Sequence, residues 1–144
     1  MATTATLTLT SSDIAGDPVN VSKSTTCTKA GGAIDLDQST GMNRIILRET
    51  TNKLLLGATA GGNDLSAKVY LINKATDPTQ YITVTINNQT IGKLYAGDWM
   101  FIPWSKTDTD ADIEVAATTY TTAGGAIPIE YCLFHEDSIR LADA

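Results

Sequence analysis

The sequence predicts an all-β protein, a single antiparallel β-sandwich of jelly-roll-like type, and three observations lead to this prediction. Apolar residues recur with the period of two that is typical of half-buried strands, and no segment sustains the helical period of 3.6. Threonine, a β-branched residue that favours strands, is the commonest residue in the chain. About ten short strand-like runs follow one another at intervals of roughly 8–12 residues, as in sandwiches and barrels.

Residues 67–104 are the most strand-like part of the chain and carry most of its large aromatic side chains. Their pattern predicts four strands separated by tight turns. One turn is expected at Asn87-Asn88, because asparagine tolerates the left-handed backbone that hairpin turns need. A second is expected at residues 96–98, Ala-Gly-Asp, directly before the last of the four strands.

That last strand is apolar on both faces. Alternation assigns its large side chains to two opposite sets: Trp99 and Phe101, and Met100, Ile102 and Trp104. A strand of this kind lies between two layers or at a subunit contact, so we expect all five residues in the core or in an interface. Pro103 cannot donate a ladder hydrogen bond and indicates a strand end or an edge position.

Further strands are expected on both sides of this stretch. In residues 5–10, Leu7 and Leu9 are expected to point inward with Ala5 while the threonines face solvent, which makes both leucines core or interface candidates. Residues 19–28 continue as a second extended segment. The remaining strands are expected at residues 33–36, 43–49, 53–56, 113–119 and 127–134, with a turn at residues 37–41 and a hairpin joining 43–49 to 53–56.

Length and charge narrow the possible classes of protein. The 144 residues suit one domain, spanning residues 1–144 with polar terminal segments. The net charge is −6 and the ten basic residues are scattered, so a nucleic acid partner is not expected. No apolar run is long enough to span a membrane, and the N-terminus lacks the pattern of a secretory signal, so no membrane partner is expected either.

The two cysteines, Cys27 and Cys132, lie far apart in the sequence. They could form a disulfide that joins the two ends of the domain, or they could be two reduced, partly buried thiols. The absence of a secretory signal favours the reduced thiols, because disulfides persist mainly in oxidising compartments.

No residue constellation predicts a catalytic site or a cofactor. The carboxylates in residues 108–114 have the spacing that starts a calcium loop, but Ile113 replaces the central glycine and Thr119 the terminal glutamate, which favours a solvated loop. His135 is the only histidine, and alone it makes neither a zinc site nor a catalytic triad.

Exposed aromatic side chains could also bind sugars, which would make the chain a carbohydrate-binding sandwich. The candidates for stacking on sugar rings are Trp99, Trp104, Tyr95 and Tyr81. Alternation puts the two tryptophans on opposite faces of their strand, whereas one platform needs its rings on one face. The pattern therefore favours packing in a core or subunit interface.

Residues 68–105 resemble small jelly-roll structural proteins of tailed bacteriophages. In those proteins a strand ending in asparagine is followed by a Thr/Val-rich strand and then by the pattern IGxLxAGDWxFIPW. Here the pattern runs from Ile91 to Trp104, and the threonine-rich residues 7–32 share the composition of the family. The resemblance covers about half of the chain.

The resemblance implies a non-enzymatic virion component. The first expectation is a decoration or cement protein that sits on the capsid surface, binds the major capsid protein and stabilises the head after assembly in the bacterial cytoplasm. Such proteins are often trimeric, so a homotrimer is expected. A tail or receptor-binding sandwich that binds glycans is the second expectation. A carbohydrate-binding module or sandwich enzyme is the third, weakened for the enzyme by the lack of paired catalytic carboxylates.

Overall fold

The computed structural model describes residues 3–12, 19–28, 36, 38–57, 66–105, 111–118 and 126–135. Within them the chain forms eleven strands and no helix, which confirms the all-β prediction. The strands are β1 (Thr4–Ser11), β2 (Val19–Thr26), β3 (Gln38–Ser39), β4 (Asn43–Leu47), β5 (Lys53–Leu56), β6 (Ser66–Asn73), β7 (Tyr81–Ile86), β8 (Gln89–Tyr95), β9 (Trp99–Ser105), β10 (Ile113–Ala117) and β11 (Ile127–His135).

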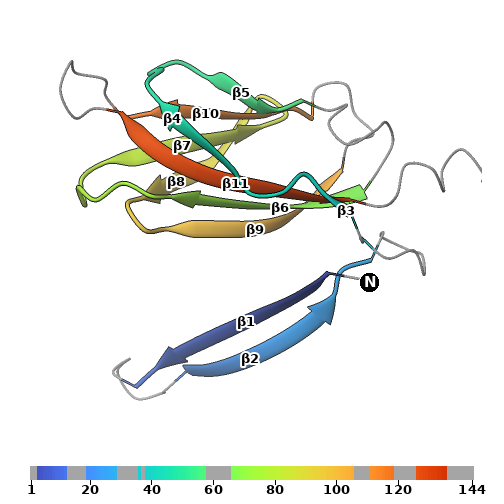
Figure 1. Ribbon diagram of the computed structural model, residues 1–144. Helices are drawn as coiled ribbons and strands as arrows, with labels where there is room; N and C mark the ends of the chain where they lie inside the picture. The colour runs from blue at the N-terminus through green and yellow to red at the C-terminus, as the bar shows by residue number, and fades with distance from the viewer. Residues whose placement is uncertain are drawn as a thin grey trace, which may run out of the picture.

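The strands from β3 to β11 form a body of two antiparallel sheets (Figure 1). One sheet has the strand order β5-β10-β7-β8. The other has the order β3-β11-β6-β9, and β4 pairs with β11 further along. From β4 onward successive strands alternate between the sheets, except that the β7–β8 hairpin stays within one of them.

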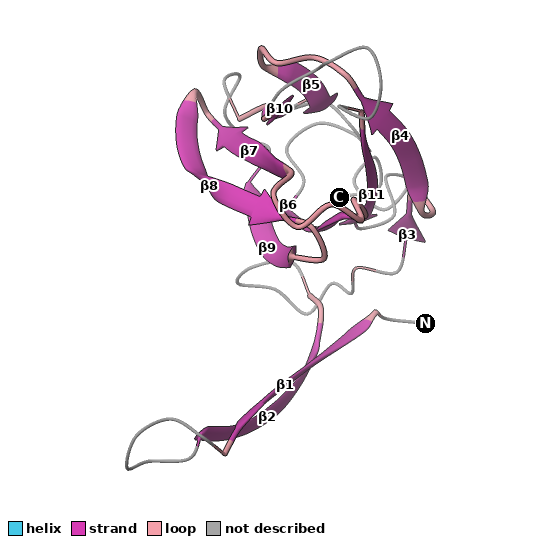
Figure 2. Ribbon diagram, turned by 90° about the vertical axis from the view of Figure 1, so that its left-hand side faces the viewer, coloured by secondary structure: helices cyan, strands magenta, loops and turns pink. Residues whose placement is uncertain are grey.

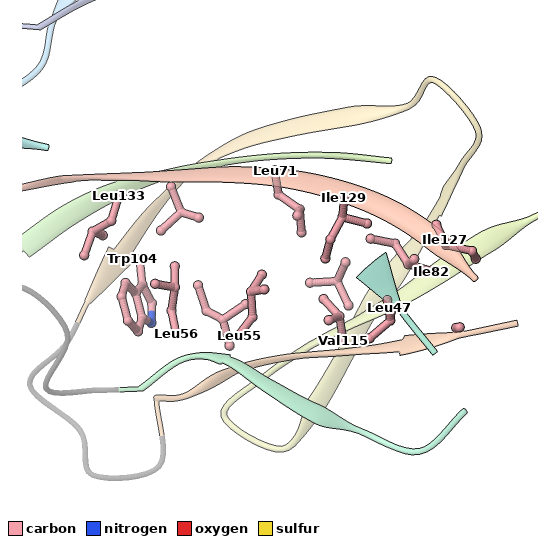
Figure 3. Close-up of a cluster of buried hydrophobic side chains, with 14 of the residues drawn as sticks. Leu47, Leu55, Leu56, Leu71, Ile82, Trp104, Val115, Ile127, Ile129 and Leu133 are labelled. Carbon is pink, nitrogen blue, oxygen red and sulfur yellow. The ribbon is translucent and has the colours of Figure 1, made fainter. Parts of the chain in front are cut away.

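The core lies between these two sheets (Figure 3). Alternation in β6 and β11 turns Leu71, Ile129 and Leu133 inward, and each is at most 1% exposed. Ile82 and Val115 meet them from the opposite sheet. Most of the hydrophobic stabilisation of the body therefore comes from aliphatic side chains, at about 1.5–3 kcal/mol for each one fully buried.

Asn73 is a buried polar residue at the end of β6 that ties two turns of the body together. Its side-chain Nδ2 donates to the carbonyl oxygens of Leu94 at 2.9 Å and Gln80 at 3.3 Å, and its Oδ1 accepts from Ala75 N at 2.8 Å. Its backbone N donates to Asp98 O at 3.0 Å. One fully buried side chain thus joins the β6–β7 and β8–β9 turns.

The β8–β9 turn has the geometry that its sequence favours. Gly97 has a φ of +88°, a region that glycine enters without steric cost. Asp98 closes the turn, because its Oδ2 accepts from Tyr95 N at 3.0 Å while its own N donates to Tyr95 O. The expected Asn87-Asn88 turn is confirmed as well, with φ values of +53° and +59°.

β1 and β2 pair with each other over all eight positions and form a hairpin that projects from the body (Figures 1 and 2). The prediction of two extended segments here is confirmed. Leu7 and Leu9, expected to point inward as core or interface residues, are 37% and 48% exposed and therefore are not core residues of the described chain, while a subunit interface stays a prediction. Alternation within a strand defines its two faces, but it does not show whether another layer of the chain covers either one.

The predicted hairpin between residues 43–49 and 53–56 is also wrong. β4 pairs with β11 and β5 pairs with β10, so the two strands lie in different sheets. The intervening residues cross from one sheet to the other, and Glu49 O accepts from Ala117 N on the way. A short polar link between two apolar runs has the same sequence pattern in a hairpin and in such a crossing.

Two smaller expectations concern residues 33–41. The short strand expected at 33–36 lies mostly outside the described residues, and Leu36 is buried without belonging to a strand. In the expected turn at 37–41, residues 38–39 form β3 instead, paired with the end of β11. Gly41, just after β3, has a φ of +75°.

Candidate functional site

The projecting hairpin has two faces of opposite chemistry. Directly paired residues of antiparallel strands lie on the same face, so the register of β1 and β2 assigns every side chain. One face carries only hydroxyl and amide side chains: Thr4, Thr6, Thr8, Thr10, Asn20, Ser22, Ser24 and Thr26. The other carries the apolar side chains: Ala5, Leu7, Leu9, Val19 and Val21, together with Ser11, Lys23 and Thr25. We call them the hydroxyl face and the apolar face.

Backbone hydrogen bonds at the base of the hairpin join its two ends to each other and to Leu36. Thr3 N donates to Leu36 O, Leu36 N donates to Cys27 O, and Cys27 N donates to Thr3 O at 2.8 Å. Cys27 and Leu36 are 2% and 0% exposed, so the attachment is closed to water. The hairpin is therefore held at one end, whereas Leu9 and Val19 near its far end are exposed.

The body presents an aromatic surface on the outer side of β6, β9 and β11. The register of these strands places Tyr70 opposite Phe101, and Lys68 opposite both Pro103 and Phe134, all on the outer face. The Phe101 and Phe134 rings meet edge to face, with centroids 6.3 Å apart. Trp99 adds a side chain that is 52% exposed. We call this surface the aromatic wall.

A cleft of about 770 Å³ separates the hairpin from the body. On the body side it is lined by the aromatic wall and Met42, which is 58% exposed. On the hairpin side it is lined by the half nearest the body, where the apolar face offers Ala5, Leu7, Lys23 and Thr25. Of the residues that line the cleft, the charged ones are Lys23 and Lys68, and none is acidic.

The two walls of the cleft differ in kind. The body side is aromatic, whereas the hairpin side consists mainly of small or polar side chains. Beyond the cleft the hairpin continues, and its apolar face there carries Leu9, Val19 and Val21 together with Ser11. β9 is also an edge strand, paired only with β6 in the described chain, so its outer edge could take a further strand.

The residues predicted as core or interface divide between these two environments. Trp104 is core, 3% exposed, and its Nε1 donates to Ala111 O at 2.7 Å. Met100 and Ile102 are half-buried and pack against the core from the same face of β9. Trp99 and Phe101 line the cleft on the opposite face, as alternation predicts, and Pro103 occupies the expected edge strand. Leu7 lines the cleft, and Leu9 lies beyond it.

Sequence reasoning missed Tyr70, Phe134 and Lys68 as members of the aromatic wall. Their alternation with buried residues of β6 and β11 places them on outer faces. These side chains come together on one outer face because β6 pairs with both β9 and β11, which are far from it in the sequence. The single-strand pattern contained the orientation of these side chains but not their proximity.

The remaining candidates provide no site in the described chain. Asp108 and Asp110 lie outside the described residues, while Asp112 and Glu114 lie just before and within β10. No group of three or more His, Cys, Asp and Glu side chains within the described ranges is placed to hold a metal ion. The part of the chain that the structure describes also contains no helix long and apolar enough to cross a membrane.

The two cysteines are free and buried, in agreement with the predicted reduced thiols. Burial raises the pKa of the Cys132 thiol, and hydrogen bonds from the Thr40 and Ser39 side chains only partly oppose this effect. We expect the native protein to react slowly with Ellman's reagent at mildly alkaline pH, because the thiolate is the reactive form. After denaturation without reductant, two thiols should titrate. Finding none would show a disulfide and contradict the assignment.

Comparison with protein-family models and with curated proteins gives no match to this chain. The motif that carries the resemblance to phage proteins nevertheless has a clear structural role. Asn73, Gly97 and Asp98 form the hydrogen-bonded turns at one end of the body, and Trp104 fills its core. These four residues do not line the cleft, whereas Trp99, Phe101 and Pro103 of the same motif do.

Proposed function

We propose that this chain is a non-enzymatic structural protein of a virion, most specifically a decoration protein that binds the major capsid protein and stabilises the assembled head. One structural observation supports the binding part of the proposal: the chain exposes two apolar surfaces at once, the apolar face of the hairpin and the aromatic wall. Isolated two-stranded hairpins are marginally stable in water, and large apolar patches mark interaction sites. We therefore expect this chain to function within an assembly in which these apolar surfaces are covered.

The strand order supports the jelly-roll part of the proposal. Apart from the two-residue β3, the sheets β4-β11-β6-β9 and β5-β10-β7-β8 have four strands each, and every connection from β4 onward except the β7–β8 hairpin crosses between them, as in a jelly roll of two Greek keys. This architecture suits a rigid virion component, and the virion role itself rests on the resemblance in residues 68–105.

A decoration role requires neither a pocket nor a cofactor, because binding alone can stabilise the head. A protein that binds only the assembled head stabilises it by mass action, by about 2.7 kcal/mol per site when the free concentration is about 100 times the dissociation constant. Many modest contacts repeated over a lattice are enough, so weak surfaces such as the edge of β9 can contribute.

The test is to mix the purified protein with matching capsids that lack it. We expect the protein to sediment with the capsids and to raise the temperature at which they release DNA or lose their shells. The matched control is the same protein added to dissociated capsid subunits, which should not bind. Failure to bind capsids in any state would remove the decoration role.

A second function, glycan binding by a tail or receptor-binding protein, is favoured by the aromatic wall. Trp99, Tyr70 and Phe101 lie on one face, which removes the geometric objection raised by Trp104. A glycan array separates the two functions. Binding that is lost in Trp99→Ala, together with no capsid binding, would support the receptor-binding role in place of decoration.

A further inference from the structure

We infer that the cleft between the hairpin and the body receives the far half of the hairpin of a second copy of this chain. The inference builds on the proposed structural role and names the contact that joins the subunits. In that contact, Leu9, Val19 and Val21 of one copy lie against Tyr70, Trp99 and Phe101 of the next.

Complementarity of both walls is the first argument for this occupant. The far half of the hairpin has an apolar face and a face of Thr8, Thr10, Asn20 and Ser22. The cleft has one aromatic wall and one wall of mainly small and polar side chains, including Ala5 and Thr25. That second wall also includes Leu7 and Lys23, and Thr3, Thr4 and Thr6 line the cleft as well. An inserted hairpin therefore places its apolar face on the aromatic wall and its hydroxyl face on a mixed wall that offers threonine hydroxyls.

Charge is the second argument. The described residues beyond the cleft in β1 and β2 carry no charged side chain, so none of them brings an ion to the aromatic wall. The two charged groups that line the cleft, Lys23 and Lys68, have long stems that can lie along apolar surface while their ammonium groups stay in water. No carboxylate lines the cleft to be desolvated.

The residues that the structure describes leave both of these surfaces uncovered. The half of the hairpin nearest the body is held at its base by the hydrogen bonds of Thr3, Cys27 and Leu36, and the cleft stands open between it and the aromatic wall. The far half extends past that wall, and Leu9 stays 48% exposed. Both complementary surfaces are present on every copy, so a second copy supplies what the first lacks.

The size of the contact is adequate for a measurable association. Four residues per strand in a two-stranded ribbon span about 13 Å by about 10 Å. With both faces and both walls counted, one insertion covers about 500 Å², and a reciprocal pair covers about 1,000 Å², which is in the range of weak or transient interfaces. A closed ring of copies uses the same contact once per neighbour. The association should therefore depend on concentration.

The experiment measures the mass of the free protein by sedimentation velocity from about 1 µM to about 100 µM, across the range expected for a small interface. We expect a closed oligomer that dissociates on dilution. Leu9→Asp and Val21→Asp each place a carboxylate against the aromatic wall and should weaken association at least tenfold. Ile91→Asp is the matched control, since Ile91 is 55% exposed on β8 away from the cleft and should leave association unchanged.

Cross-linking identifies the contact. Leu9→Cys protein is mixed with Lys68→Cys protein and treated with a short bismaleimide. Wild-type protein treated in the same way is the blank, because its two native thiols are buried. We expect mixed Leu9→Cys to Lys68→Cys dimers. Predominant Leu9→Cys to Leu9→Cys dimers would show that the hairpins meet each other, and would overturn the insertion.

The remaining outcomes are equally decisive. A wild-type protein that stays monomeric at every concentration overturns the inference. So does an oligomer that both aspartate variants leave intact, given that circular dichroism shows them folded. Capsid binding is measured separately. A monomer that still binds capsids removes only this inference, and an oligomer that binds none removes only the decoration role.

Discussion

Replacing Asn73 with alanine is expected to lower the free energy of unfolding by about 3 kcal/mol. The side chain is fully buried and makes three hydrogen bonds, to Leu94 O, Gln80 O and Ala75 N. Alanine leaves two carbonyl oxygens and one N–H without these partners inside the protein, and each unsatisfied buried group is costly. For a domain of this size the loss corresponds to a fall in Tm of roughly 10 °C. Differential scanning calorimetry measures it.

A second variant separates hydrogen bonding from packing. Asn73→Asp keeps the size and the acceptor for Ala75 N, but it directs a carboxylate at the oxygens of Leu94 and Gln80. Burial and these oxygens should raise the folded-state pKa of the new carboxyl above its unfolded value. Its stability deficit should therefore be smallest below the unfolded pKa and grow as the pH rises through the folded pKa.

Asn52→Ala is the control, because Asn52 is exposed in the connection between β4 and β5 and should change stability by less than about 0.5 kcal/mol. A cost below about 1 kcal/mol for Asn73→Ala would contradict the assigned role of Asn73, since the turns would then form without it. A pH-independent deficit in Asn73→Asp would contradict its buried position.

The local parts of this fold could be predicted from the sequence. Period-two alternation located the four strands between residues 66 and 105, and Asn87-Asn88 identified a turn whose φ values are indeed positive. Alternation also placed Trp99 and Trp104 on opposite faces of β9. Each of these features depends on residues close together in the chain, where backbone sterics and side-chain direction decide the outcome.

The parts that failed depend on contacts between distant segments. The link between β4 and β5 has the composition of a hairpin turn, yet it joins two sheets. The reason is that β4 pairs with β11 in one sheet and β5 pairs with β10 in the other. Leu7 and Leu9 have the pattern of core residues, yet nothing in the described chain covers the face that bears Leu9. A sequence pattern records that a surface is apolar and leaves open which layer, or which molecule, covers it.

The same limit applies to the candidate site. Trp99 and Phe101 were expected to be core or interface residues, but the aromatic wall also needs Tyr70 from β6 and Phe134 from β11. Their proximity follows from β6 lying between β9 and β11. The direction of a side chain within one strand was predictable. The cleft was not, because it is formed by residues of three strands and a hairpin that are far apart in the sequence.

Substitution of the two tryptophans of β9 is expected to lower the free energy of unfolding by very different amounts. Trp104→Ala should lower the free energy of unfolding by about 3–5 kcal/mol, because it empties a buried aromatic site in the core. It also removes the Nε1 donor that Ala111 O accepts at 2.7 Å. Trp99→Ala should cost less than about 1 kcal/mol in the free subunit, since half of its side chain is already in water.

Self-association should show the reverse order. Under the inferred insertion, Trp99→Ala removes part of the aromatic wall and should weaken association at least tenfold, whereas Trp104→Phe changes only the interior. Trp104→Phe keeps a ring in the core and should cost about 1–2 kcal/mol, mainly for the lost hydrogen bond. Denaturant unfolding at low protein concentration gives the stabilities, and sedimentation gives the association constants.

Intrinsic fluorescence checks the environments directly, because each single variant leaves one tryptophan. The emission of Trp104 should be blue-shifted and resist quenching by iodide, and that of Trp99 should be red-shifted in the dilute protein and shift toward blue as copies associate. If Trp99→Ala destabilises the dilute subunit as much as Trp104→Ala does, the hairpin closes over its own body. The aromatic wall is then an interior of one chain, and no second copy is needed to cover it.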